Sequence, residues 1–180
     1  MPFAIREYRN VVPLKPQDVV VALKLLAHPN TAWSYPKLAV DLSMSASEVH
    51  SSVRRATRSG LLQDNERHVP NRKALLEFLV HGLKYVFPAD HGGLTRGLPT
   101  AHAAPPLRDR FAASDEPPPV WADPEGTVRG QELAPLYRSV PKAARADNQL
   151  YEFLALVDAI RSGRAREREL AVKELRSRLG

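Results

Sequence analysis

The sequence predicts a mainly α fold with a small β-wing. Apolar residues recur at helical spacing in several stretches before residue 88 and again after residue 143. Between these stretches, ten of the sixteen prolines fall within residues 88–141, which excludes most regular helix there. We therefore expect a helical domain with an N-terminal arm over 1–87, a proline-rich extended segment over 88–143 and a helical hairpin over 144–180 for dimerisation or partner binding.

The chain opens with an arm and a first helix. Residues 1–14 mix apolar and charged side chains and form an arm or an edge strand, because Pro13 and Pro16 end any regular element there. Residues 17–28 then predict a helix, with Asp18 in its first turn, where the helix dipole favours an acid.

The next stretch, residues 35–62, predicts two short helices joined by a tight turn. Apolar residues at helical spacing define a first helix that ends near Leu42. Ser45 opens the second helix and forms a capping box with Glu48 three residues later. Gly60 ends that helix as a left-handed residue would, and an apolar pair follows. Helix, turn, capped helix and then Gly-Leu-Leu is the pattern of a helix-turn-helix that continues into a wing.

The second helix leaves hydroxyl, imidazole and guanidinium groups off its apolar stripe. In a major groove, side chains near the start of such a helix reach base edges, and later arginines contact phosphates. Ser45 lies at the start of this helix, and we count it among the residues predicted to contact DNA. We predict base-edge contacts from Ser47, His50, Ser51 and Arg54, and phosphate contacts from Arg55 and Arg58.

A polar, turn-rich segment follows Leu62 and predicts the wing. Two short strands would flank a turn at Asp64-Asn65. Arg67 is the wing's candidate for a phosphate or minor-groove contact. Asp64 and Glu66 would be repelled by phosphate, so this wing is a weaker DNA element than the helix.

These residues resemble the winged helix-turn-helix transcriptional regulators of the MarR and IclR type. The shared positions are Leu38, Ala39, Leu42, Met44, Ser45, Val49, Val53, Gly60, Leu61 and Leu62. The chain departs from the pattern at Ala56, where a larger Leu is usual. The resemblance implies a dimer that binds double-stranded DNA with residues 45–59 in the major groove. The arm would then reach DNA through Arg6 and Arg9, or cross onto the second subunit.

Residues 72–87 form the most apolar helix in the first half of the chain. Apolar side chains lie on more than one of its faces, so we expect it to be buried in its own domain and against a second subunit. His81-Gly82 lowers the helix propensity in the middle and marks a possible kink.

The proline-rich segment is too apolar for a solvated linker, and we expect it to pack in extended form on its own or a neighbouring subunit. Within it, residues 119–126 predict a short strand that runs into a turn. Further on, Asp147 caps a helix that runs to about Ser162, and residues 165–179 form the last helix. Acids interleave with the arginines of that helix, which favours a solvated, salt-bridged face.

Composition limits the possible functions. The net charge is +6, and residues 15–87 hold ten Lys and Arg against six Asp and Glu, which suits a polyanionic partner. There is no Cys, the six His have no metal-ligand spacing, and no catalytic motif is present. We therefore expect neither an enzyme nor a bound cofactor or metal. No apolar run approaches a membrane span, so a cytoplasmic, nucleoid-associated protein is expected.

Two functions from different classes are consistent with the sequence. The first is a sequence-specific, dimeric regulator of transcription that binds double-stranded DNA. The second is a protein-interaction subunit, such as an antitoxin that silences a partner enzyme through residues 88–180. In that second interpretation the winged helix is a scaffold or an autorepressor.

Overall fold

The computed structural model describes residues 13–112 and 114–180. Most of the predicted arm, with Arg6 and Arg9, lies outside the described residues. The elements in chain order are α1 (Pro16–Ala27), α2 (Tyr35–Leu42), α3 (Ala46–Arg58), α4 (Arg72–Glu77), the π-helical turn η1 (Phe78–Gly82), α5 (Leu83–Val86), β1 (His91–Pro99), the 3-10 turns η2 (Ala101–Ala103) and η3 (Arg108–Arg110), β2 (Pro119–Ala122), β3 (Val128–Leu133), α6 (Val140–Ala146), α7 (Asn148–Ser162) and α8 (Ala165–Leu179). The fold is thus mostly helical with one small sheet.

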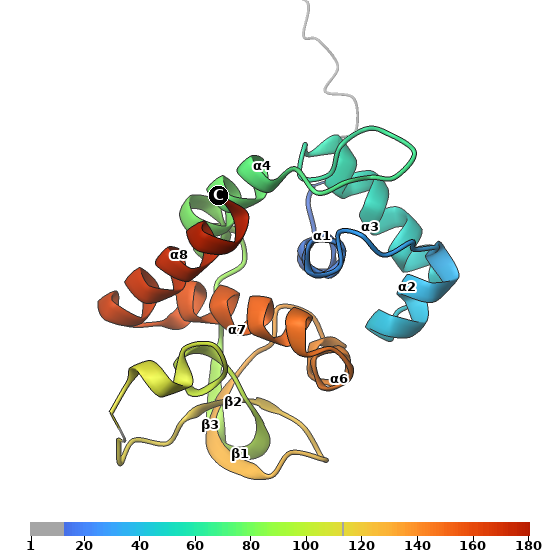
Figure 1. The fold of residues 1–180 in the computed structure, drawn as a ribbon. Helices are drawn as coiled ribbons and strands as arrows, with labels where there is room; N and C mark the ends of the chain where they lie inside the picture. Colours follow the sequence, from blue (N-terminus) through green and yellow to red (C-terminus); the bar gives the residue numbers. More distant parts are fainter. Residues whose placement is uncertain (1–12, 113) are drawn as a thin grey trace, which may run out of the picture.

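Helix α7 lies at the centre of the molecule, between α1–α3 on one side and the three strands on the other (Figure 1). Every residue from Phe153 to Ile160 is buried, so this helix contacts protein on all sides. The buried apolar side chains form one contiguous hydrophobic core, which includes residues from Val19 in α1 to Leu179 in α8. The three predicted parts of the chain therefore share a core. None of the helices in the described residues is both long and apolar enough to cross a membrane.

The predicted caps around α3 are confirmed. The Ser45 hydroxyl accepts a hydrogen bond from the Glu48 amide at 3.1 Å, and the Glu48 carboxylate accepts one from the Ser45 amide at 2.9 Å. Ser43 takes a left-handed conformation in the turn after α2, with φ 51°. Gly60, with φ 77°, ends α3 as a left-handed residue.

Of the predicted pair of wing strands, only an isolated bridge forms. Between α3 and α4 the only β contact in the described residues is a single bridge from Leu62 to Pro70. The amide of Gln63 also donates to the Val69 carbonyl at 2.8 Å, which closes residues 64–68 into a loop. Polar residues with no apolar alternation cannot bury one face of a strand, and this loop is turn-rich for that reason.

The predicted helix over 72–87 is interrupted by the π-helical turn Phe78–Gly82. This position matches the expected weak point at His81-Gly82. A side chain at Gly82 would place its Cβ 2.9 Å from the Phe78 ring, so the absence of one lets that ring pack against the helix.

The proline-rich segment forms more regular structure than predicted. Strand β1 pairs antiparallel with β2 and β3, which pair parallel with each other, so the three strands close on themselves. The predicted strand at 119–126 is confirmed for Pro119–Ala122, and a turn follows it. Helix α6 begins at Val140, so the predicted extended segment ends before residue 143. Pro141 lies in the first turn of this helix, where a proline is tolerated.

A buried ion pair joins the sheet to the helices. The Asp158 carboxylate accepts hydrogen bonds from Thr100 Oγ1 at 2.8 Å, Trp121 Nε1 at 2.6 Å and Arg161 Nη1 at 2.7 Å. Arg161 Nε in turn donates to the Phe87 carbonyl at 2.8 Å, at the end of α5. Buried charges persist only when they are paired and hydrogen-bonded, and this set meets that condition.

Candidate nucleic-acid interface

Helix α3 presents one buried side and one exposed side. Val49, Val53 and Ala56 are fully buried against α1 and α2, as the apolar stripe predicts. Of the side chains predicted to contact DNA, Ser51 is partly buried; those exposed to solvent are Ser45, Ser47, His50, Arg54, Arg58 and, in the loop, Arg67. The structure therefore brings most of the predicted residues to one open surface.

Arg55 is the exception, and its predicted phosphate contact is wrong. Its guanidinium donates to both carboxylate oxygens of Asp18 in α1, at 2.6 and 2.8 Å. The Asp18 side chain is 0% exposed and that of Arg55 is 12% exposed. Hydrogen bonding to Asp18 raises the pKa of Arg55 above its usual value. This arginine therefore holds α3 on α1 and is not available to DNA.

The start of α3 contacts a distant part of the chain. The Glu48 carboxylate accepts a hydrogen bond from the Tyr137 hydroxyl, and Arg138 Nη2 lies 3.3 Å from it. The Tyr137 bond, followed by the two Ser45 bonds, lowers the pKa of Glu48 to about 2. Arg138 is 79% exposed, so it adds a cation beside the first turn of the helix.

Aromatic rings support the middle of the exposed side. The His50 ring lies 5.1 Å from Tyr35, and Tyr35 lies 5.3 Å from Trp33 in an edge-to-face arrangement. Trp33 also lies 6.1 Å from His68 in the loop. Trp33, just before α2, and Tyr35, its first residue, both pack against the core. These contacts limit the freedom of His50 while its ring stays exposed.

The loop that replaces the wing is fixed beside α3. His68 Nδ1 lies 3.2 Å from the Thr57 hydroxyl near the end of the helix. The Trp33 indole N–H donates to the Arg67 carbonyl at 3.1 Å, and the Asn65 side chain accepts from the Arg67 amide. The backbone of Arg67 is thus held in place, and its side chain is exposed next to α3.

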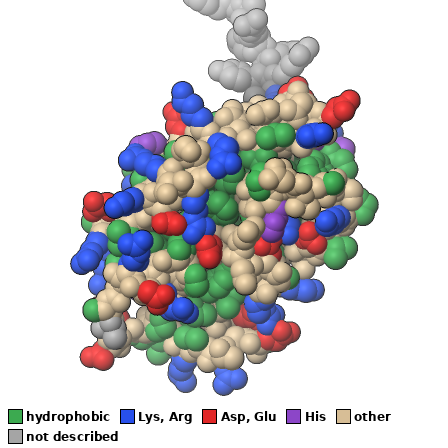
Figure 2. Space-filling view, in the orientation of Figure 1, with side chains coloured by type: hydrophobic (Ala, Val, Ile, Leu, Met, Phe, Trp, Pro, Cys, Tyr) green, Lys and Arg blue, Asp and Glu red, His purple; other side chains and the backbone are tan. Residues whose placement is uncertain are grey.

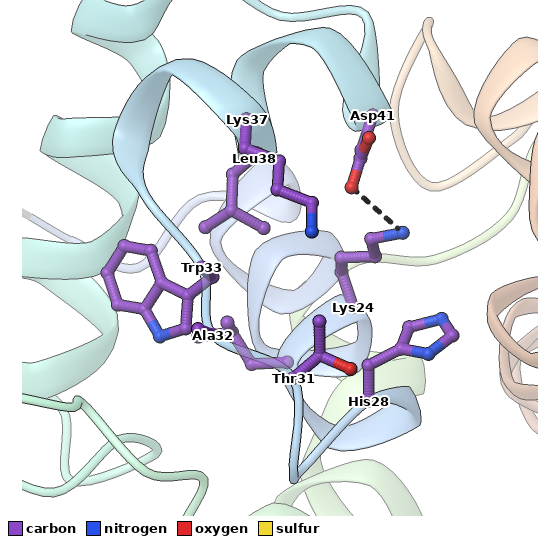
Figure 3. A pocket seen from close by; sticks show the side chains of 9 residues that line it. Lys24, His28, Thr31, Ala32, Trp33, Lys37, Leu38 and Asp41 are labelled. Carbon is purple, nitrogen blue, oxygen red and sulfur yellow. Dashed lines mark ion pairs between the residues drawn. The ribbon is translucent and has the colours of Figure 1, made fainter.

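A small cavity of about 170 Å³ lies behind this surface, between α1 and α2 (Figure 3). Lys24 Nζ lies 3.3 Å from Asp41 of α2 and 2.7 Å from Asp147, and His28 also contacts Asp147 at 2.7 Å. Burial opposes the charge on Asp147, but bonds from Lys24, the Leu150 amide and His28 hold its pKa below the ordinary value. These ion pairs fix α1 and α2 to the N-terminus of α7 and leave Lys37 exposed at the cavity edge.

The sequence did not single out three cations near this surface. Lys37 is exposed on the first turn of α2, and Lys142 is exposed on α6, which packs against α2. Arg138 reaches α3 from a position 90 residues later in the chain. Lys37 could have been found from its place on the helix before the turn, but no local signal brings Arg138 to α3 or Lys142 to α2.

Comparison with protein-family models, curated proteins and solved structures found no match to this chain. Across residues 13–112 and 114–180, no three His, Cys, Asp or Glu side chains are grouped to hold a metal ion.

Proposed function

We propose that this protein binds double-stranded DNA with α3 in the major groove and regulates transcription. One observation carries the proposal: α3 buries its apolar side completely and exposes Ser47, His50, Arg54 and Arg58 on the other. A helix of this kind, preceded by a shorter helix and a tight turn, is the element that helix-turn-helix proteins insert into DNA. Ser47, His50 and Arg54 would meet base edges, and Arg58 would contact a phosphate.

The cations around α3 support phosphate binding. Lys37, Arg54, Arg58 and Arg67 are exposed, and within the described ranges none of them forms an ion pair. Each phosphate neutralised contributes about −0.9 to the slope of log K against log salt. Four such contacts predict a slope of about −3.6 for one subunit and about −7 for a dimer.

A two-fold dimer would place two copies of α3 about 34 Å apart, in successive major grooves. The exposed apolar residues Tyr85 and Val86, 74% and 53% exposed, offer a contact surface at the end of α5. This is the helix that the sequence assigns to dimerisation.

The test is binding to a fluorescent random-sequence duplex at low and moderate salt. Arg54→Ala and Arg58→Ala should each weaken binding by about 1–3 kcal/mol, and only Arg54→Ala should relax base preference in a selection from random sequences. Arg129→Ala is the matched control, because this arginine is exposed on β3, across α7 from α3 (Figure 1). Equal affinity for wild type and both α3 variants would overturn the proposal.

A further inference from the structure

A second basic surface lies away from α3, along the last helix. A groove of about 500 Å³ lies between α8 and the segment η1–α5. We call it the α8 groove. Its apolar lining comes from Val80 in the π-helical turn, Ile160 in α7 and Val172 in α8. Figure 2 shows several Lys and Arg side chains on the side of the molecule where Figure 1 places α8.

The α8 groove has an excess of positive charge. Lys84, Arg168, Lys173 and Arg176 line it against a single acid, Glu169. Within the described residues none of these four cations forms an ion pair, although Lys84 lies over the Tyr85 ring, 4.7 Å from its centre.

The expected salt-bridged face of α8 forms only in part, because its other acids have different partners. Glu167 accepts from the Arg164 amide in the capping box of α8 and lies 3.3 Å from His102. Glu174 lies 2.8 Å from Arg178, which is also paired with Glu152 at 2.7 Å. In the described parts of the chain the cations that face the groove therefore form no ion pair, and Glu169 is the one acid that lines the groove with them.

The spacing along α8 defines what would fit. Arg168, Val172 and Arg176 follow each other at intervals of four residues and therefore lie on one side of the helix. The two arginines are about 12 Å apart along the helix axis, with an apolar side chain between them. A complementary ligand carries an apolar side chain flanked by carboxylates about one helical turn away on each side.

We propose that the α8 groove binds an acidic, amphipathic segment of a protein partner. The apolar lining favours a peptide over a nucleic acid, because a phosphate backbone has no side chain to bury there. The site goes beyond DNA binding and is compatible with it, since α8 and α3 lie on opposite sides of α1 (Figure 1). The protein would then bind DNA and a protein partner through separate surfaces.

The experiment is a selection of displayed random peptides on the full chain, followed by affinity measurement with the best synthetic peptide. Enriched peptides should share an apolar residue flanked by Asp or Glu. Arg168→Ala/Arg176→Ala should weaken that peptide about tenfold. Arg96→Ala/Arg129→Ala is the matched control, because both arginines are exposed on the sheet and removing them deletes the same charge. It should leave the affinity unchanged.

A charge-reversed pair sharpens the test. Arg168→Glu/Arg176→Glu should abolish binding of the acidic peptide. The variant protein should instead bind a version of that peptide in which Lys replaces each acid. The proposal would be overturned if the enriched peptides carried no acids, or if the control variant lost as much peptide affinity as Arg168→Ala/Arg176→Ala. Loss of duplex affinity instead of peptide affinity would make the groove a DNA contact, and a change in solution mass would make its occupant a second copy of this chain. Both of those results also overturn it.

Discussion

Removing the Arg55 guanidinium should destabilise the fold and leave the exposed side of α3 chemically intact. In Arg55→Ala the Asp18 carboxylate stays fully buried without its partner. Breaking a buried ion pair in this way costs about 3–5 kcal/mol. The Lys15 amide, 2.8 Å from Asp18, still donates to the carboxylate, and the helix N-terminus still favours it. We therefore expect a loss at the lower end of this range, about 3 kcal/mol in the free energy of unfolding, which is a large share of the stability of a typical domain.

Urea unfolding followed by tryptophan fluorescence measures this loss, because Trp121 is fully buried and becomes exposed on unfolding. Arg54→Ala is the matched control: the neighbouring arginine is exposed, and its loss should change stability by less than about 0.5 kcal/mol. Asp18→Leu/Arg55→Met should recover most of the stability, since it removes both charges and keeps apolar volume. If Arg55→Ala were as stable as wild type and bound DNA more weakly, this arginine would be a phosphate contact and the argument for its structural role would fail.

Three further predictions concern Glu48, Asp158 and Gly60. The pKa of Glu48 is lowered to about 2, so the ionised carboxylate stabilises the fold above about pH 4.5, and this stabilisation is lost as the pH falls toward 2. In Glu48→Gln, the free energy of unfolding should fall by about 1 kcal/mol less over this pH range than in wild type. Tyr137→Phe should reproduce part of this effect. Urea unfolding curves measured across the range give both values. Asp158→Ala leaves the buried Arg161 guanidinium unpaired and should cost at least about 3 kcal/mol in urea unfolding. The added Cβ in Gly60→Ala has no atom within 4 Å, so only the positive φ at this residue opposes the change. Thermal unfolding should show a loss of stability of about 1 kcal/mol. A wild-type melting temperature in that variant would contradict this reasoning.

Local signals predicted the ends of the helices. The capping box at Ser45 and Glu48 and the cap at Asp147 need only groups three residues apart, so they can be read from sequence. Gly60 takes the left-handed conformation for the same local reason. One strand of the sheet was predicted, but its partners were missed because they pair across long separations, such as Leu98 with Trp121, and prolines obscured the alternation.

Long-range contacts decided which predicted site residues are available. Arg55 lies next to the buried stripe of α3, and the sequence cannot show that Asp18, read as a favourable first-turn acid, faces it from another helix. In the same way, Tyr137 and Arg138 reach the start of α3 only because α6 packs against α2. The exposed residues at 47, 54 and 58 were predictable, since they lie far from the apolar stripe.

The most direct test of the account is to map the DNA-contacting residues by amide NMR, titrating the labelled full chain with a short duplex. The largest shifts should fall on α3, from Ser47 to Arg58, and on the loop around Arg67. The amides of β3 should not move. Shifts confined to α8, or the absence of any shift at low salt, would contradict the claim that the exposed side of α3 meets DNA.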